Sequence, residues 1–143
     1  MTIRIAQTDA DLQQCLPALL VLRPHLNEAR AMAMLQEQQA HEQFQVAFVE
    51  AGDTPAPAVI TYRKLTLLVS GKTVYIDDLT TLPSARGNGY AAALLDFVID
   101  QARQLGCQTV SLDSGHGADR ADAHRLYLNK RFRISSHHFS LTL

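Results

Sequence analysis

The sequence predicts a mixed α/β domain in which a central, mostly antiparallel sheet carries helices on both faces. Three observations support this fold class. Segments with the two-residue period of strands are interspersed with segments of helical period, and each is long enough for one element. Polar turns containing glycine or proline separate several of these segments. The hydrophobic fraction of 47% is enough for one core, so we expect residues 1–143 to form a single domain.

The first half of the chain predicts one strand, two helices and a three-stranded meander. Leucines at helical spacing follow Thr8 and Asp9, either of which can cap a helix, and Asn27 can cap a second one. The period then changes to two, and turns at 52–55 and 70–72 connect three strands in antiparallel order. The expected elements are a strand at 2–6, helices at 9–22 and 27–40, and strands at 44–50, 58–69 and 73–82.

The second half predicts a strand–helix–strand unit, then a helix and a closing strand. The clearest helix spans 87–105, because its apolar residues form one stripe and Gly106 is a good C-terminal cap. A crossover through this helix makes the next strand, at 108–113, parallel to the strand at 73–82. The remaining elements are a helix at 118–130 and an alternating segment at 132–143 that we expect to close the sheet.

Composition limits the classes of function. The formal net charge of −1 provides no general attraction to nucleic acid or to an anionic membrane, so neither partner is expected. Cys15 and Cys107 lack the spacing of metal ligands, and no metal site is expected. The first residues carry charges that interrupt a secretory segment, and the apolar runs are too short to cross a membrane. We therefore expect a cytoplasmic protein.

A glycine-rich loop before the strongest helix has the properties of a phosphate-binding site. Its sequence is Arg86-Gly87-Asn88-Gly89-Tyr90-Ala91. A helix N-terminus presents unpaired N–H groups and the positive end of the dipole, and glycines let the backbone approach a phosphate closely. Arg86 adds a fixed positive charge. These features suit a pyrophosphate, and the spacing is not that of a P-loop; a turn that only begins the helix is the alternative.

The same loop resembles the signature of the GNAT superfamily of N-acetyltransferases. That signature is Gln or Arg, two residues, Gly, one residue, and Gly or Ala. The matching residues are Arg86, Gly89 and Ala91. The run at 75–83 also resembles the family's fourth strand, and residues 123–127 followed by Phe132 resemble its last motif. Arg131 departs from the glycine that usually precedes this phenylalanine.

The resemblance implies that acetyl-CoA is the co-substrate and that no metal takes part. In this family acetyl-CoA lies in an opening between the fourth and fifth strands, and the fourth strand pairs with its pantetheine arm. By position, the resemblance implies main-chain contacts from Leu79, Thr80 and Thr81, and one N–H group there would stabilise the oxyanion. The pyrophosphate contacts that it implies come from Arg86, Gly87, Asn88, Gly89, Tyr90 and Ala91.

Three side chains are candidates for acid–base chemistry. An alkyl amine is mostly protonated at neutral pH, so a base must take its proton. Asp77 and Asp78 are adjacent in a predicted strand, so we expect them to face opposite sides of the sheet. The resemblance favours Asp77 as general base or amine anchor, with Asp78 as the second candidate. Tyr127 matches the family's tyrosine, which implies that it protonates the departing CoA thiolate.

The resemblance also implies where the acceptor binds. In this family the segment between the first two helices covers the acceptor pocket, which points to Arg23 and His25, and Asp113, Tyr62 and Arg63 are further candidates. We expect a small-molecule primary amine; acidic side chains would suit a cationic amine, whereas Arg23 and His25 would suit an acceptor with a carboxylate. The alternatives are a protein N-terminus or lysine as acceptor, and a non-catalytic acyl-CoA-binding regulatory module. Because many members of the family are dimers, a homodimer is also an expectation of the resemblance.

Overall fold

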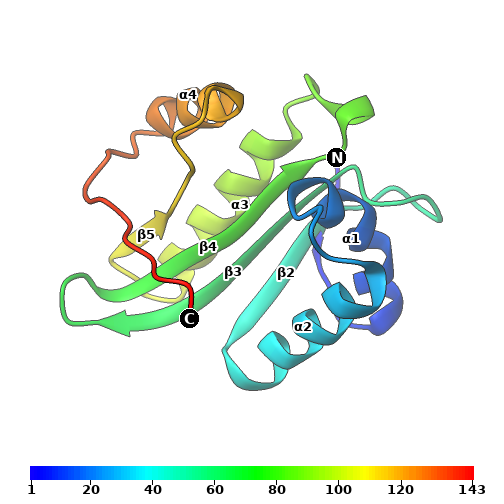
Figure 1. Ribbon diagram of the computed structural model, residues 1–143, viewed down its shortest axis with the longest axis horizontal. Coiled ribbons are helices and arrows are strands. Elements are labelled where there is room, and N and C mark those ends of the chain that lie inside the picture. Colours follow the sequence, from blue (N-terminus) through cyan, green and yellow to red (C-terminus); the bar gives the residue numbers. More distant parts are fainter. The chain divides into compact units, whose positions relative to one another are not determined.

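A five-stranded sheet forms the centre of the fold, with its strands in the order β1-β2-β3-β4-β5 (Figure 1). The computed structural model describes all 143 residues, in two compact units, Met1–Ser111 and Leu112–Leu143. The strands are β1 (Ile3–Ile5), β2 (Phe44–Val49), β3 (Ala58–Leu67), β4 (Gly71–Thr81) and β5 (Thr109–Leu112). The mixed α/β class is confirmed, and a single domain over 1–143 stays a prediction.

Four of the strands form the predicted antiparallel arrangement. β1 pairs with β2, β2 with β3, and β3 with β4, all antiparallel. β5 follows β4 in the sheet, and the Gln108 N–H just before β5 donates a hydrogen bond of 2.8 Å to the carbonyl of Lys72, the second residue of β4. The two strands therefore begin side by side and run parallel, as a crossover through a helix predicts.

Helices cover both faces of the sheet in the first unit. α1 (Asp9–Leu22) and α2 (Glu28–His41) lie on one face, and α3 (Tyr90–Gln104) lies on the other (Figure 1). The core beneath α1 and α2 joins alternate residues of β2 to leucines of α1: Phe44, Val46, Phe48, Leu12 and Leu16. On the other face Leu94, Leu95 and Val98 of α3 are fully buried. The apolar stripe that predicts α3 is therefore the side that packs on the sheet.

Several helix ends lie where the sequence predicts them. The Thr8 hydroxyl accepts a 3.2 Å hydrogen bond from the Asp11 N–H, and the Asp11 carboxylate accepts one of 3.2 Å from the Thr8 N–H, which together form a capping box. The Asn27 side chain caps α2 by accepting from the Arg30 N–H at 2.9 Å. Gly106, with φ of +71°, follows α3 in the left-handed conformation that favours glycine. None of the helices has the length and apolar character that crossing a membrane requires.

A β-bulge interrupts the ladder between β3 and β4. Thr61 pairs with Asp78, but the next residue, Tyr62, pairs with Ile76. Asp77 is therefore an extra residue of β4 with no partner directly opposite. Because a bulge breaks the strict alternation of side chains, it decides which face of the sheet the neighbouring aspartates take.

The second unit contains one helix and an irregular C-terminal segment. A 3-10 turn (Ala118–Arg120) leads into α4 (Ala121–Asn129), which confirms the predicted helix at 118–130. The predicted strand at 132–143 is wrong, because these residues form no strand. The alternation of apolar residues changes phase at the two adjacent histidines, so no single face of a strand would collect them. Ile134 and Phe139, on either side of this change, are 84% and 90% exposed.

Candidate functional site

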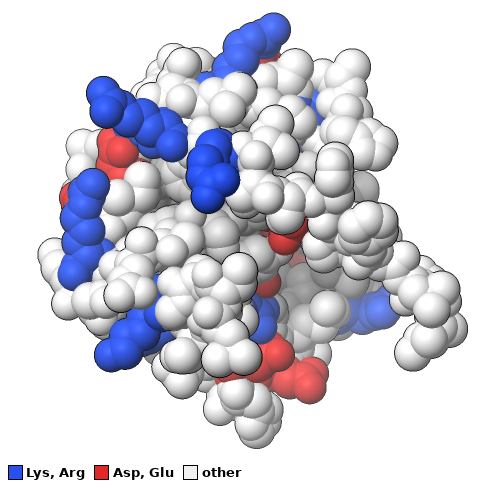
Figure 2. Space-filling view, turned by 90° about the vertical axis from the view of Figure 1, so that its left-hand side faces the viewer, with Lys and Arg blue, Asp and Glu red and all other residues white.

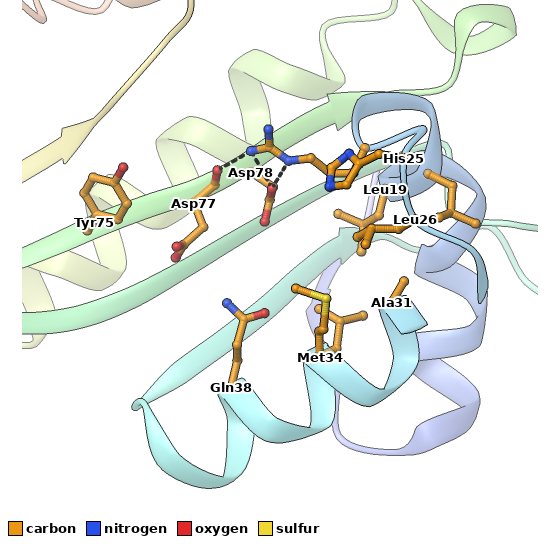
Figure 3. Close-up of a pocket in the computed structure, with 12 residues that line it drawn as sticks. Leu19, His25, Leu26, Ala31, Met34, Gln38, Tyr75, Asp77 and Asp78 are labelled. Carbon is orange, nitrogen blue, oxygen red and sulfur yellow. Dashed lines mark hydrogen bonds and ion pairs between the residues drawn. The ribbon is translucent and has the colours of Figure 1, made fainter. Parts of the chain in front are cut away.

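A cavity of about 380 Å³ lies between α1, α2, the segment that connects them, and β4 (Figure 3). Its apolar lining consists of Leu19, Leu20, Leu26, Ala31, Met34 and Leu35. Its polar lining consists of Arg23, His25, Gln38, Tyr75, Asp77 and Asp78. The cavity is of the size that holds a small molecule, and its polar side chains include both predicted aspartates and both predicted residues of the helix connection.

The two aspartates face the same side of the sheet, so the prediction that they face opposite sides is wrong. Thr61 and Arg63 are two residues apart in β3 and share a face. The Thr61 hydroxyl donates to Asp78 at 2.5 Å, and the Arg63 guanidinium donates to Asp77 at 2.9 and 3.0 Å. Both carboxylates therefore lie on the face that carries Thr61 and Arg63. The bulge at Asp77 is the physical reason, since it inserts one residue into the alternation.

Asp77 has a fixed and largely buried counterion. Arg63 binds both of its carboxylate oxygens, and the side chains of Arg63 and Asp77 are 16% and 18% exposed. Arg63 also lies 3.4 Å from a carboxylate oxygen of Glu42, and its guanidinium carbon lies 5.5 Å from the centre of the Phe44 ring. Burial raises the pKa of Asp77, the Arg63 hydrogen bonds and charge oppose that shift, and the negative charges of Asp78 and Glu42 add to it. The resulting carboxylate accepts a proton more readily than an ordinary aspartate.

Asp78 has a counterion that reaches it from the helix connection. Arg23 lies directly after α1, and its Nε and Nη2 atoms lie 2.9 and 2.8 Å from Asp78 Oδ1. Arg23 Nη2 also donates to the main-chain carbonyl of Asp77 at 3.1 Å (Figure 3). The Arg23 side chain is 45% exposed, whereas that of Asp78 is 17% exposed. One arginine therefore links the connection between α1 and α2 to the bulge of β4.

The glycine-rich loop presents free main-chain donors at the start of α3. Gly87 and Gly89 have φ of +81° and +77°, which favours glycine at both positions. Asn88 Nδ2 donates to the Ala85 carbonyl at 2.9 Å and closes the turn. The first intrahelical hydrogen bond runs from the Ala93 N–H to the Gly89 carbonyl at 3.0 Å, so the N–H groups of the three preceding residues have no partner within the helix. These residues are Tyr90, Ala91 and Ala92. Such a helix start can bind an anion without rearrangement.

The end of β4 leads into the glycine-rich loop, and one of its two edges pairs with β3. Leu79, Thr80 and Thr81 lie opposite Ile60, Val59 and Ala58 of β3. In an antiparallel pair alternate residues direct their N–H and C=O groups to the other edge of the strand. The Thr80 hydroxyl donates to the Ala18 carbonyl at 3.0 Å and is buried, so this side chain ties β4 to α1. The Thr80 side chain is therefore not available to a ligand, and main-chain contacts of these three residues with a ligand at the outer edge stay a prediction.

Tyr127 lies in α4 of the second unit and is buried. Its ring centre lies 6.1 Å from that of Phe132, and the Phe132 N–H donates to the Tyr127 carbonyl at 3.0 Å. Burial raises the pKa of Tyr127, and the charge and hydrogen bond of Arg120 oppose that shift. The phenol therefore remains protonated at neutral pH and can donate a proton.

Comparison with known proteins identifies the family. A sequence model of the acetyltransferase (GNAT) family matches residues 11–132. The chain belongs to this family. The uncharacterized N-acetyltransferase YhdJ of Bacillus subtilis (strain 168) is 44% identical over 70 residues, which are 48% of this chain and 48% of that protein. The aminoalkylphosphonate N-acetyltransferase of Salmonella typhimurium (strain LT2) is 34% identical over 68 residues, 48% of this chain and 43% of that protein. The match spans about half the length of these curated relatives.

Solved structures share the GNAT fold over the whole chain. A transcriptional regulator from Bacillus halodurans C-125 superposes with a TM-score of 0.85 at 22% identity, covering 99% of each chain. A structure titled predicted acetyltransferase with acetyl-CoA, from Clostridium acetobutylicum, has a TM-score of 0.74 at 16% identity and covers 99% of this chain and 95% of that one. At this level of identity the likeness shows the fold alone.

Within this GNAT chain the structure brings some predicted site residues together and leaves others apart. Arg23, His25, Asp77 and Asp78 line one cavity, as described above. Tyr62 does not, because it lies on the opposite face of β3 and lines a second cavity with Lys64 and Val74. Asp113 follows β5, and its carboxylate lies 3.5 Å from His138 Nδ1. Its part in acceptor binding stays a prediction.

The sequence missed four polar residues of the site, Gln38, Glu42, Thr61 and Tyr75. Tyr75 precedes Asp77 by two residues in β4, so alternation alone could have placed it on the same face. Glu42 directly follows α2, and no local pattern relates it to Arg63. No group of three or more His, Cys, Asp or Glu side chains in this structure is arranged to hold a metal ion.

The charged surface is mixed on the face that Figure 2 draws. Lys and Arg side chains on this face are interspersed with uncharged and acidic residues (Figure 2). The whole chain carries a formal net charge of −1.

Proposed function

We propose that this GNAT chain transfers the acetyl group of acetyl-CoA to the primary amine of a small molecule that binds between α1, α2 and β4. The observation that carries the proposal is the pair of carboxylates that the β4 bulge directs into one cavity of about 380 Å³. Carboxylates attract a protonated amine, and one of them can also accept its proton. The cavity volume suits a small molecule better than an extended peptide segment.

The loop before α3 supports acetyl-CoA as the co-substrate. The GNAT family uses acetyl-CoA, and this chain has the free helix-start amides that a pyrophosphate needs at Tyr90, Ala91 and Ala92. Arg86 is exposed beside them and adds charge. The main chain of Leu79 to Thr81 would hold the pantetheine arm, and an N–H group there would stabilise the oxyanion of the tetrahedral adduct.

In the proposed reaction Asp78 anchors the ammonium group and Asp77 accepts one of its protons, directly or through a water molecule. The freed lone pair attacks the thioester carbon and forms the C–N bond. The C–S bond then breaks, the nitrogen loses a second proton to solvent, and the CoA thiolate takes the proton of Tyr127. A phenol with a raised pKa is protonated at neutral pH, which this last step requires.

Two measurements test the proposal. Isothermal titration of the purified chain with acetyl-CoA tests cofactor binding, and thiol release from acetyl-CoA in the presence of pooled small amines or, separately, of pooled peptides tests transfer. We expect binding, and thiol release with at least one amine pool. Binding without release from any pool would favour a non-catalytic acyl-CoA-binding module, release with peptide acceptors alone would favour a protein acetyltransferase, and no binding would overturn the cofactor assignment.

A glycine substitution tests the loop directly. At both Gly89 and Gly52 φ is positive and an added Cβ would meet nothing within 4 Å, so alanine causes a similar backbone strain at either position, about 1 kcal/mol. Gly89→Ala should weaken acetyl-CoA binding about tenfold, because its Cβ would point into the space that we assign to the pyrophosphate. Gly52→Ala, in the turn between β2 and β3, should leave the affinity unchanged; equal affinities for both variants would refute the loop assignment.

A further inference from the structure

The two aspartates of the pocket differ in how firmly their counterions are held. Arg63 is 16% exposed, belongs to a central strand, and is fixed by Asp77, Glu42 and the Phe44 ring. Arg23 is 45% exposed, belongs to the connection after α1, and contacts only the bulge of β4 through its guanidinium. Asp77 therefore has a permanent partner, whereas the partner of Asp78 can move into solvent while the strands stay in place.

The position of Arg23 is the position that a cationic acceptor would take. Its guanidinium donates to Asp78 Oδ1 and to the main-chain carbonyl of Asp77, two acceptors that line the cavity. An alkylammonium group has the same charge and up to three donors, so it can satisfy the same acceptors. Both cations cannot occupy this position together. A cationic acceptor must therefore displace Arg23 before it can pair with Asp78.

Resting on the proposed function, we propose that the acceptor is an alkylamine with an apolar body and no anionic group, and that Arg23 acts as a competing internal cation that sets its affinity. The remaining walls favour this class of acceptor. Leu19, Leu26, Met34 and Leu35 offer apolar contacts to the body of the amine.

The charge of the pocket disfavours an acceptor with a carboxylate. The cluster contains three carboxylates, of Asp77, Asp78 and Glu42, and two guanidinium groups, of Arg23 and Arg63. It carries one net negative charge, and a second when Arg23 moves away. A carboxylate on the acceptor would be repelled by this cluster, since like charges in a partly buried site are poorly screened.

The experiment compares Arg23→Gln with Arg30→Gln. Both changes remove one positive charge near α2, but Arg30 does not line the cavity. The acceptors are a short primary alkylamine and the ω-amino carboxylate of the same length, and KM and kcat are measured for each. A half-exposed ion pair contributes at most about fivefold to an equilibrium constant. Arg23→Gln should therefore lower the KM of the alkylamine about threefold with kcat unchanged, and Arg30→Gln should change neither.

A double variant separates direct competition from a general change in charge. In an Asp78→Asn background the ammonium has lost its carboxylate, so Arg23→Gln should no longer lower the KM of the alkylamine. An equal decrease in that background, or no decrease in the wild-type background, would overturn the inference. So would a raised KM of the amino carboxylate in Arg23→Gln, because Arg23 would then bind the anion of the acceptor. Absence of thiol release by the wild-type chain with any amine would instead overturn the proposed function itself.

Discussion

The junction of β1 with α1 and the bulge of β4 each contain an arginine bound to both oxygens of an aspartate, yet the two carboxyl groups differ in acidity. At the junction Arg4 donates to Asp11 at 2.7 and 3.0 Å. Asp11 also accepts hydrogen bonds from the N–H groups of Gln7 and Thr8 at 2.8 and 3.2 Å. The Arg4 hydrogen bonds, followed by those from the main chain, hold the pKa of Asp11 well below its usual range.

At the bulge the surroundings act in the opposite direction. Burial is the largest single influence and raises the pKa of Asp77, Arg63 lowers it, and the carboxylates of Asp78 and Glu42 raise it further, so that the pKa lies above its ordinary value. An arginine partner therefore does not by itself reveal what an aspartate does. Asp11 is surrounded by hydrogen-bond donors and links β1 to α1. Asp77 instead lies among other negative charges beside a cavity, as catalytic carboxylates often do.

The largest expected effect separates the two aspartates by activity. Asp77→Asn removes the proposed base while keeping the size of the side chain, and should lower kcat about 100-fold or more. Asp11→Asn makes the same chemical change at a position outside the cavity, and should leave kcat within about twofold of the wild type. Steady-state rates of thiol release with a saturating amine measure both.

The control for Asp77→Asn is cofactor binding. Calorimetric affinity for acetyl-CoA should be the same in this variant as in the wild type, since Asp77 lies in the acceptor pocket. A rate of Asp77→Asn close to that of the wild type would remove Asp77 from the mechanism and leave Asp78 as the remaining carboxylate of the pocket.

A smaller effect on kcat is expected at Tyr127. Burial shifts its pKa in the same direction as that of Asp77, but the consequence for catalysis differs. Burial raises the pKa of both Asp77 and Tyr127. For the carboxylate this creates a stronger base, whereas for the phenol it keeps the proton bound at neutral pH and makes the group a weaker acid. Tyr127→Phe should lower kcat about 10- to 100-fold, because a thiolate is already a fair leaving group. The affinity for acetyl-CoA should not change, and an unaltered kcat would exclude Tyr127 as the acid.

The comparison also shows what sequence alone could predict. The glycine loop, its helix and the caps at Thr8 and Asn27 are local features, and short-range patterns predicted all of them. The segment at 132–143 also alternates locally, but a strand needs a partner edge and one consistent apolar face, and here the alternation changes phase. The local pattern was therefore sufficient to predict helices whose caps lie next to them in the sequence. It was insufficient to predict a strand, which depends on pairing with a distant segment.

The site shows the same limit. Asp77 and Asp78 were found from their position before the loop, but alternation assigned them to opposite faces because a bulge cannot be recognised in a single strand. It depends on the register with β3, where Tyr62 pairs with Ile76 and Thr61 with Asp78. The contacts of Arg63 and Arg23 with these aspartates depend on the same register and on the path between α1 and α2. These contacts distinguish the proposed base, Asp77, from the proposed anchor, Asp78. They are tertiary contacts, so a local sequence pattern does not reveal them.

The smallest expected effect is on stability. Here the variant of Asp11, not that of Asp77, should show the larger loss. Because the pKa of Asp11 is lowered by folding, its contribution is fully present above its unfolded pKa, about 3.9, and is lost as pH falls below that value. Asp11→Asn should therefore lower the free energy of unfolding by about 1–2 kcal/mol at pH 7. The difference in stability between this variant and the wild type should become smaller as pH falls from 6 to 3.

For Asp77 the sign is opposite. Its pKa is raised by folding, so the ionised form opposes folding at neutral pH, and Asp77→Asn removes that cost while Arg63 keeps Glu42 as a partner. The Asp77→Asn variant should be at least as stable as the wild type at pH 7, although it is the less active of the two variants. Thermal unfolding of the three proteins at pH 7 and pH 3 measures this. If Asp77→Asn were the less stable variant at pH 7, Asp77 would be a structural clip like Asp11, and the contrast between the two regions would fail.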